Sequence, residues 1–267
     1  MMTQQLRNAL ATNKLFSFVR AWVNAFCDPL HLIRGVLGVR GYFKDFKKYR
    51  SFAKAEKIKV LDLRPKLHDR TPKTLFDPHY FWMSGWAIRR ILADQPAFHV
   101  DVGSHNLFVN LLGAVVPTVF VDYRPLLVRL SGLNPFAGDI LNLPFKDSCL
   151  RSLSCLHVAE HIGLGRYGDP LNPRGTELAC RELIRVLAPG GNLFFALPVG
   201  KKRICFNAHR IHPPERIENL LSPLRLLEFS TVYDDGEYRQ HVPISDISTS
   251  VYGLGLFWFK KVVCYEC

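Results

Sequence analysis

Hydrophobic positions in the second half of the chain fall into short continuous runs that polar turns separate. Four of these runs cover residues 98–103, 118–123, 153–157 and 192–198. Runs that are apolar throughout predict strands with both faces covered, as in a parallel sheet flanked by helices. A further strand is predicted just before Gly138, and two more near residues 225–233 and 254–261. This pattern predicts an α/β fold.

A helix is predicted between the strands at 153–157 and 192–198. The spacing i, i+3, i+4, i+7 of one buried helical face is followed by Cys180, Leu183, Ile184 and Leu187. Glu177 and Arg181 are four residues apart and form an expected ion pair on the outer side. The run Pro189-Gly190-Gly191 is expected to end the helix, since proline cannot continue it and glycine permits a sharp exit.

The first 80 residues follow a different pattern and are predicted to be a separate extension. Residues 1–60 indicate two or three helices, which glycines at positions 35, 38 and 41 are expected to interrupt. Residues 60–80 contain three prolines and predict an irregular connection, with one short strand at 59–63. The main domain, residues 81–267, is predicted to start with a helix at 86–93. The inward side chains expected there are Trp86, Ile88, Ile91 and Leu92.

Positive charge is concentrated in the extension. The whole chain has a formal net charge of +12, and residues 1–60 contain 12 Lys and Arg against three acidic residues, a net charge of +9. Such a segment attracts polyanions such as nucleic acid, acidic lipid or a charged glycan, or it is a solvated helical face. Nucleic acid is disfavoured because no strand pattern supports an RNA-binding sheet. Two interpretations stand: peripheral contact with a membrane surface, or packing on the main domain or on a second subunit.

Composition favours a folded protein of a reducing compartment. Hydrophobic residues make up 48% and charged residues 22% of the chain, which is typical of a globular domain. The seven cysteines form no disulfide framework and no metal-like spacing with histidine, so no metal is predicted. Cys264 and Cys267 are expected to be surface thiols. The polar start of the chain does not indicate a signal peptide, and a cytoplasmic location is expected. Oligomeric state is not indicated.

Acidic residues follow or end three of the predicted strands. They are Asp101 in Asp101-Val102-Gly103-Ser104-His105, Asp122 in Val121-Asp122-Tyr123, and Asp139 in Gly138-Asp139-Ile140. Ligands of open α/β sheets bind at the carboxyl ends of the strands, where the backbone at Gly103 permits close approach. A carboxylate at position 122 is suited to accept the ribose hydroxyls of an adenosine. These positions predict a nucleotide-type ligand, although a turn or cap role for Asp139 is an alternative.

Residues 139–200 resemble the second half of class I S-adenosylmethionine-dependent methyltransferases of the type 11 kind. The blocks that carry the resemblance are Asp139-Ile140, Leu143-Pro144-Phe145, His157-Val158-Ala159-Glu160-His161 and Arg185-Val186-Leu187-Ala188-Pro189-Gly190-Gly191. The resemblance covers residues 81–263 and implies a Rossmann-like, seven-stranded, mostly parallel sheet whose last strand is antiparallel. The chain departs from the family at His105, which stands where the second motif glycine is expected and would crowd the methionine end of the cofactor.

The resemblance implies S-adenosylmethionine as the cofactor. Its expected contacts are Asp101, Gly103, Ser104, Asp122, Asp139 and Ile140. Asp139 would bond the adenine amino group, and Ile140 would pack on the base. NAD is the alternative ligand of this crevice. NAD is expected to fit this crevice less well, because binding of its pyrophosphate requires Gly-x-Gly-x-x-Gly and the loop after the first strand has one glycine.

Candidate catalytic residues follow the strand at 153–157. Histidine titrates near neutral pH, so His157 or His161 could accept a proton from a hydroxyl nucleophile, with Glu160 as the orienting group. The alternative is that these histidines only shape the site. Two polar segments predict an acceptor site, a Gly- and Pro-rich loop at 163–175 and a cluster at 206–213. The candidate residues are Arg166, Tyr167, Asp169, Asn207, His209 and Arg210.

The His157–His161 block and these two segments are also similar to a bacterial methyltransferase-like family of unassigned function that is linked to surface polysaccharide synthesis. This resemblance implies O-methylation of a sugar or glycan precursor in polysaccharide biosynthesis. Two other hypotheses stand beside it. One is a methyltransferase-like binding protein without catalytic activity, in which the departure at His105 abolished turnover. The other is an NAD-linked oxidoreductase on a related fold.

Overall fold

The computed structural model describes residues 18–19, 22–23, 28–52, 56–124, 126–247 and 249–262. Cys264 and Cys267 lie outside these residues. The chain forms two compact units, which divide between Leu75 and Phe76. Within the described residues, no helix combines the length and the apolar character needed to cross a bilayer.

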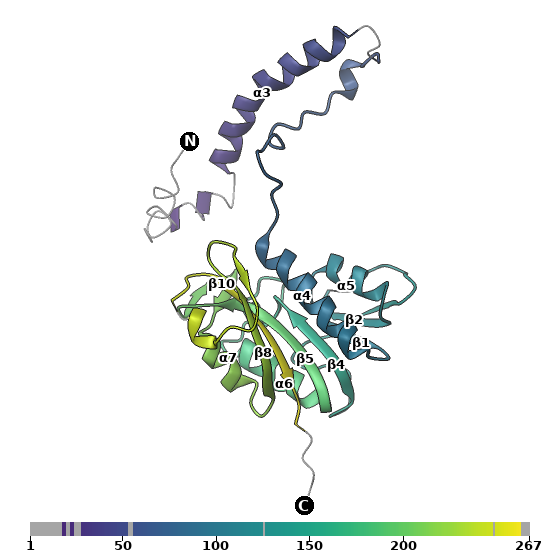
Figure 1. Cartoon of the computed structure of the whole chain (residues 1–267), viewed down its shortest axis with the longest axis vertical. Coiled ribbons are helices and arrows are strands. Elements are labelled where there is room, and N and C mark those ends of the chain that lie inside the picture. Colours follow the sequence, from purple (N-terminus) through teal and green to yellow (C-terminus); the bar gives the residue numbers. More distant parts are fainter. Residues whose placement is uncertain are drawn as a thin grey trace, which may run out of the picture. The chain divides into compact units, whose positions relative to one another are not determined.

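The second unit is built on one mixed sheet with the strand order β3-β2-β1-β4-β5-β10-β8-β9 (Figure 1). Five neighbouring strands are parallel: β1 (His99–Val102), β2 (Thr118–Asp122), β3 (Leu133–Ala137), β4 (Leu150–Leu156) and β5 (Leu187–Val199). β10 (Gly253–Lys260) is antiparallel to both β5 and β8 (Arg225–Val232). The prediction of a Rossmann-like sheet with an antiparallel last strand is therefore confirmed. The two-residue β9 (Tyr238–Arg239) extends the sheet to eight strands.

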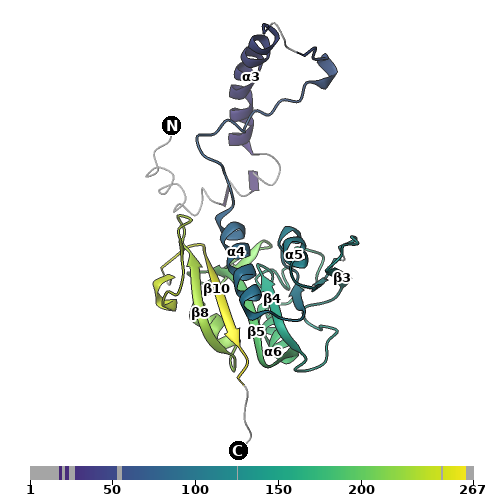
Figure 2. The same ribbon diagram turned by 45° about the vertical axis from the view of Figure 1, so that its right-hand side comes forward.

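Helices cover both faces of this sheet (Figures 1 and 2). α4 (Pro78–Asp94) and α5 (Asn106–Gly113) pack on one face, and α6 (Gly175–Val186) and α7 (Pro214–Leu220) pack on the other. Successive side chains of a strand point to opposite faces, so Phe194 joins the core under α4 and Phe195 joins the core under α6. Because both faces are covered, consecutive residues of a strand such as Phe194 and Phe195 can both be apolar.

The predicted helix at 86–93 is longer than expected. α4 begins at Pro78, where the Asp77 carboxylate caps the helix by accepting a hydrogen bond from the His79 N–H at 2.9 Å. Met83 and Ala87 are buried, whereas Leu92, expected to face inward, is 40% exposed. Near its other end, Arg90 forms an ion pair with the buried Glu228 of β8, which holds the helix on the sheet.

The helix before β5 ends earlier than predicted. α6 stops at Val186, and Pro189-Gly190-Gly191 lie inside β5 rather than at a helix end. The Glu177–Arg181 ion pair is confirmed, with 2.5 Å between nitrogen and oxygen. After β5, a short hairpin is formed by β6 (Arg203–Cys205) and β7 (His209–Ile211). A 3-10 helix, η2 (Ile244–Ile247), precedes β10.

The first unit contains the long helix α3 (Pro29–Arg50), which continues through all three glycines that were expected to interrupt it. The reason is close packing: a Cβ atom at Gly38 would lie 2.8 Å from the carbonyl oxygen of Leu67. Glycine therefore allows the segment around residues 63–70 to lie directly against the helix. The short strand predicted at 59–63 is instead a 3-10 helix, η1 (Val60–Asp62).

Candidate functional site

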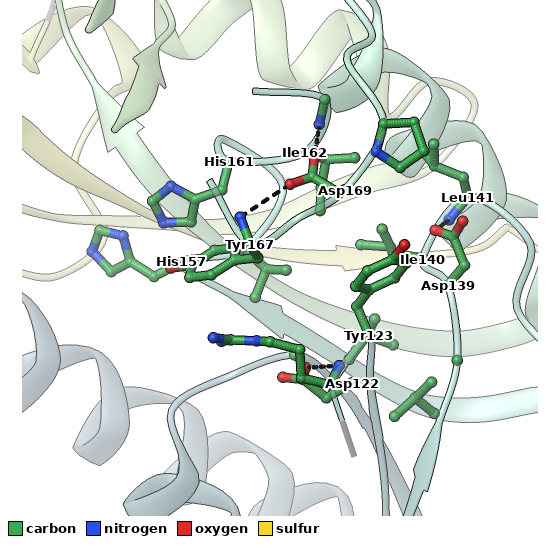
Figure 3. A pocket seen from close by; sticks show the side chains of 18 residues that line it. Asp122, Tyr123, Asp139, Ile140, Leu141, His157, His161, Ile162, Tyr167 and Asp169 are labelled. Atoms are coloured by element: carbon green, nitrogen blue, oxygen red, sulfur yellow. Dashed lines mark hydrogen bonds between the residues drawn. The ribbon is translucent and has the colours of Figure 1, made fainter. Parts of the chain in front are cut away.

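A pocket lies at the carboxyl ends of the parallel strands (Figure 3). Eight residues predicted from the sequence line it: Gly103, Asp122, Asp139, Ile140, His157, His161, Tyr167 and Asp169. Figure 3 shows the two imidazoles at one end of the pocket and Asp139 with Ile140 at the other. The structure thus brings together side chains from the ends of four strands, as the positions of the acidic residues predicted.

Asp122 and Asp139 are held in the same way. Oδ1 of Asp122 accepts a hydrogen bond from the Arg124 N–H at 2.7 Å, and Oδ1 of Asp139 accepts one from the Leu141 N–H at 2.8 Å. Within the described part of the chain, the second oxygen of each carboxylate has no hydrogen-bond partner. Each aspartate is therefore fixed by its own turn and keeps one acceptor for a ligand.

Asp101 and Ser104 do not line the pocket, which corrects their expected direct contact with a cofactor. Asp101 is fully buried inside β1, where its carboxylate accepts hydrogen bonds from the Ser104 N–H at 3.0 Å and from the hydroxyls of Ser104 and Ser154. Burial raises its pKa to about 6. The Ser104 hydroxyl in turn accepts from the Leu156 N–H at 3.1 Å. These bonds join the ends of β1 and β4 and so position His157.

His105, the departure from the family motif, also lies outside the pocket lining. It is the N-cap of α5, and its Nδ1 accepts a hydrogen bond from the Leu107 N–H at 3.3 Å. The side chain therefore does not fill the space expected for the cofactor. It does occupy one of the free N–H groups at this helix start, which a pyrophosphate would require.

A second, more open hollow adjoins the first pocket and shares His157 and His161 with it. Its other polar and aromatic walls include Asp77, His79, Tyr80, Arg166, His209, Asp234 and Tyr252. Five of these seven come from segments that the sequence analysis did not select, the start of α4 and the chain after β8 and before β10. β8 runs parallel to β5 because both are antiparallel to β10, so its carboxyl end lies at the same edge of the sheet.

His157 and Glu160 form the centre of the site. His157 directly follows β4 in a left-handed conformation, with φ of 60°, which is uncommon for a residue with a side chain and is found at functional sites. Its Nδ1 lies 2.6 Å from Oε1 of Glu160, and Nε2 of His161 lies 3.5 Å from the same oxygen. Glu160 is fully buried. Burial opposes its ionisation, but the charge of His157, its hydrogen bond and the charge of His161 outweigh burial and lower the pKa of Glu160.

The hydrogen bonds assign the protons of both histidines. An ionised Glu160 only accepts, so Nδ1 of His157 donates to it, and in the neutral ring Nε2 is the nitrogen that carries the lone pair. That Nε2 atom is buried and has no hydrogen-bond partner within the described residues. Nδ1 of His161 donates to the Ala208 carbonyl at 2.6 Å. His157 is therefore arranged to accept a proton, with a carboxylate behind it to stabilise the resulting cation.

Aromatic rings surround His157 on the side of the second hollow. His79 stacks on both His157 and Tyr252, with ring centroids 5.5 and 5.1 Å away, and the Tyr80 ring lies 5.3 Å from His157. Burial lowers the pKa of His79 and of His209 to about 4 and raises the pKa of Tyr252 to about 12. All three are therefore neutral near pH 7, and they offer ring faces and uncharged hydrogen-bonding groups.

The loop at 163–175 lines the first pocket through Tyr167 and Asp169, whereas Arg166, the third predicted acceptor residue of this loop, lines the second hollow. The Tyr167 ring lies between two guanidinium groups, with the Arg124 Cζ 4.3 Å and the Arg166 Cζ 5.2 Å from its centroid. The Asp169 carboxylate accepts from the N–H groups of Gly163 at 2.6 Å and Tyr167 at 3.2 Å, which fixes the loop. Arg124 comes from the end of β2, so the Arg124–Tyr167 contact closes the loop over the pocket.

The second predicted acceptor cluster is only partly assembled. His209 lines the second hollow, whereas Asn207 is exposed and lines neither cavity. Arg210 is 4% exposed, and its guanidinium donates to the carbonyls of Ile162 at 2.5 Å and Asn172 at 3.0 Å. The expected substrate contact of Arg210 is therefore corrected: it anchors the 163–175 loop.

The hydrogen-bond acceptors and the apolar side chains of the first pocket fit an adenosine. Two carboxylate oxygens are free to accept from hydroxyl or amino groups, and Val121, Ile140 and Leu141 supply an apolar wall for a base. Among the described residues, no group of three or more His, Cys, Asp or Glu side chains could hold a metal ion.

Comparison with known proteins shows a similarity of fold, but it does not identify an activity. A family profile described as "Caenorhabditis protein of unknown function, DUF268" matches residues 150–244. No curated protein matches the chain in sequence. Among solved structures, the chain is similar to the N-methyltransferase NodS of Bradyrhizobium japonicum WM9 in complex with S-adenosylhomocysteine. The two share 15% identity and a TM-score of 0.49, over 82% of this chain and 97% of NodS.

Two other solved structures are similar to the same extent. The YcgJ protein of Bacillus subtilis shares 14% identity and a TM-score of 0.48, over 68% of this chain and 99% of that protein. The [4+2]-cyclase SpnF shares 15% identity and a TM-score of 0.48, over 68% of this chain and 80% of SpnF. Identities of 14% and 15% show likeness of fold alone, so the function of this chain has to be argued from its own site.

Proposed function

We propose that the protein is an S-adenosylmethionine-dependent methyltransferase that methylates a hydroxyl group of a sugar or glycan precursor. The observation that carries the proposal is the position of His157. It lies where the pocket of Asp122 and Asp139 meets the aromatic hollow, with a buried, unpartnered Nε2 and a carboxylate on Nδ1. A base at the junction of two sites is what transfer from one ligand to another requires.

The first pocket would hold the cofactor. The free oxygen of Asp122 would accept from the ribose hydroxyls, that of Asp139 from the adenine amino group, and Ile140 would pack on the base. Gly103, with φ of 71°, keeps the end of β1 free of a side chain beside the pocket. S-adenosylmethionine would supply an electrophilic methyl group there.

The aromatic hollow would hold the acceptor. The rings of His79, Tyr80 and Tyr252 offer flat faces, and their polar atoms are uncharged near pH 7, which suits a neutral, hydroxyl-bearing ring. Arg166 and His209 add hydrogen-bonding groups at its rim. Nε2 of His157 would take the hydroxyl proton, and Glu160 would stabilise the imidazolium. The sugar class of the acceptor rests on this lining and on the resemblance of the His157–His161 block.

The Tyr167 loop would exclude water from the cofactor pocket during the reaction. We place the reaction in the cytoplasm, a reducing compartment, and this location is part of the proposal. It is supported by Cys149, Cys155, Cys180 and Cys205, which are free thiols in the structure.

A thermal-shift comparison of S-adenosylhomocysteine, S-adenosylmethionine, NAD and UDP-sugars tests the cofactor. A ligand at a hundred times its dissociation constant stabilises a protein by about 2.7 kcal/mol, which for a domain of this size raises Tm by roughly 5–10 °C. We expect this shift with S-adenosylhomocysteine and none with NAD. The reverse result would establish the oxidoreductase alternative.

Transfer of a labelled methyl group from S-adenosylmethionine to a panel of sugars and nucleotide sugars tests the reaction. We expect label in a hydroxyl-bearing acceptor. Tight binding of S-adenosylhomocysteine, with no transfer to any acceptor in the panel or in cell extract, would instead support a binding protein without catalytic activity.

A further inference from the structure

Helix α3 has two chemically different faces, and one of them is already covered. Residues at three- and four-residue intervals share one side of a helix, and here that side contains His31, Gly35, Gly38, Tyr42 and Asp45. Within the same unit, His31 stacks on His68 with ring centroids 3.6 Å apart, and Asp45 forms an ion pair with Arg70 at 2.5 Å. This face is therefore explained by packing against residues 63–70.

The opposite face of α3 has large apolar side chains that are exposed. Between 40% and 73% of the surface is exposed for each of Leu32, Ile33, Val36, Leu37, Val39 and Phe43. The helix has 22 residues and none of them is buried. Water contact with this much apolar side chain is unfavourable, and a contiguous patch of this kind marks an interaction surface.

The same face becomes basic toward the end of the helix. Positive charges on it or at its margins are Arg40, Lys44, Lys47, Lys48 and Arg50. Asp45 is the one acidic residue within α3, and it lies on the other face, paired with Arg70. The exposed face is thus apolar in its first half and basic in its second half, with no acidic group to balance it.

The combination of an apolar half and a basic half indicates which kind of partner covers this face of α3. A second copy of α3 would bring like charges together in the basic half if the two helices were parallel, and would set basic side chains against apolar ones if they were antiparallel. A lipid surface with anionic headgroups satisfies both halves, because apolar side chains reach the acyl-chain boundary while Lys and Arg contact phosphates. We infer that α3 binds the surface of a membrane that contains anionic lipids, lying in the plane of the surface. This inference is independent of the proposed methyl transfer.

Sedimentation of the full-length chain with vesicles tests the inference. Vesicles of phosphatidylcholine alone are compared with vesicles that contain about one third phosphatidylglycerol. We expect binding to the anionic vesicles, weakened by salt, and little binding to the neutral ones. The pair Lys44→Glu and Lys47→Glu should weaken binding by at least about tenfold, since each charge near an anionic surface contributes substantially.

Two matched controls test whether the loss of vesicle binding is specific to this face of α3 or follows from any change in surface charge or surface apolarity. Lys201→Glu with Lys202→Glu reverses two exposed charges in the second unit and should leave vesicle binding unchanged. Leu37→Asp, at a side chain 73% exposed, should weaken binding, whereas Val115→Asp, at one 58% exposed in the second unit, should not. Circular dichroism confirms that each variant keeps its helix content.

Three results would overturn the inference. One is equal binding to neutral and anionic vesicles. Another is equal loss of binding in the α3 variants and in their controls. The third is an absence of vesicle binding together with a dimer, seen by light scattering, that Leu37→Asp dissociates. That last result would assign the face to self-association.

Discussion

Nδ1 of His157 lies 2.6 Å from Oε1 of Glu160, and the carboxylate of Glu160 is completely shielded from solvent. A buried carboxylate is stable only when it is paired, and here the partners are two imidazoles. The pairing fixes the ring of His157, a residue that lines both cavities, and places the proton of the neutral ring on Nδ1. Its role in the proposed reaction can be tested by removing the negative charge alone.

Glu160→Gln should reduce turnover by about a hundredfold or more and change the affinity for S-adenosylhomocysteine by less than about threefold. The neutral amide cannot stabilise an imidazolium as a carboxylate does, and general-base catalysis contributes about 10²–10⁴-fold. Turnover and calorimetry measure the two quantities. Glu177→Gln, at a carboxylate on the outer side of α6 that pairs with Arg174 and Arg181, is the matched control and should keep wild-type turnover.

The proton on His157 can be observed without an acceptor. Long-range ¹⁵N NMR of the imidazoles should show the Nδ1–H tautomer for His157 in the wild type and a change in Glu160→Gln. Wild-type His157 with its proton on Nε2 would contradict the assignment of this nitrogen as the base.

Arg124→Ala should make the cofactor pocket open more readily. The Arg124 guanidinium lies over the Tyr167 ring, and a cation–π contact of this kind contributes about 0.5–2 kcal/mol. We expect S-adenosylhomocysteine to dissociate roughly two- to thirtyfold faster, as measured by stopped-flow fluorescence. Arg151→Ala, at an exposed arginine of β4, is the control. An unchanged dissociation rate in Arg124→Ala would show that the loop does not retain the ligand.

The stability of the fold should decrease in mild acid because of buried neutral histidines. Burial lowers the pKa of His79, His209 and His212 to about 4 and that of His99 to about 3. In the unfolded chain these groups take up protons near pH 6.5, so the unfolded state binds more protons between pH 6.5 and about 4. Their contribution to stability is therefore complete above pH 6.5 and is lost as the pH falls toward 4.

Asp101 has the opposite effect on the pH dependence of stability. Its pKa is raised from 3.8 to about 6, so the folded state binds more protons than the unfolded state in that range and gains stability as the pH falls. Because four histidines oppose one carboxyl, we expect Tm to fall by several degrees between pH 6.5 and about 4. His212→Asn should give a shallower fall, as measured by differential scanning calorimetry. A Tm that is constant or rises over this range would contradict the neutral, buried state of these histidines.

Much of the fold could be predicted because apolar runs report burial directly. The strand that ends at Asp122 and the strand that ends before His157 are read from continuous runs of mostly apolar residues with a polar residue after them. Element ends were less predictable, because tertiary packing decides them. Gly38 looked like a helix breaker and instead admits Leu67, and Pro189-Gly190-Gly191 lies within a strand.

Site residues could be predicted where a side chain directly follows a strand in the sequence. They could not be predicted where segments that are distant in the sequence come together in the fold. His79 and Tyr252 are 173 positions apart in the sequence and stack on each other only because the start of α4 and the start of β10 reach the same edge of the sheet. Arg210 looked like a ligand for a polar substrate, but its partners are two backbone carbonyls that no sequence pattern reveals. Of the predicted acceptor residues, Arg166 and His209 are the ones that line the second hollow.

The central claim is that the free carboxylate oxygen of Asp122 grips the ribose of S-adenosylmethionine, and calorimetric titration with S-adenosylhomocysteine tests it most directly. Asp122→Asn leaves the side-chain oxygen that can accept from the Arg124 N–H but replaces the second acceptor with a donor. We predict affinity at least tenfold weaker, since mismatched buried hydrogen bonds cost about 1–3 kcal/mol. Asp94→Asn, at an exposed aspartate ending α4, should bind like the wild type. No binding to the wild-type protein, or equal binding to wild type and Asp122→Asn, would contradict the account.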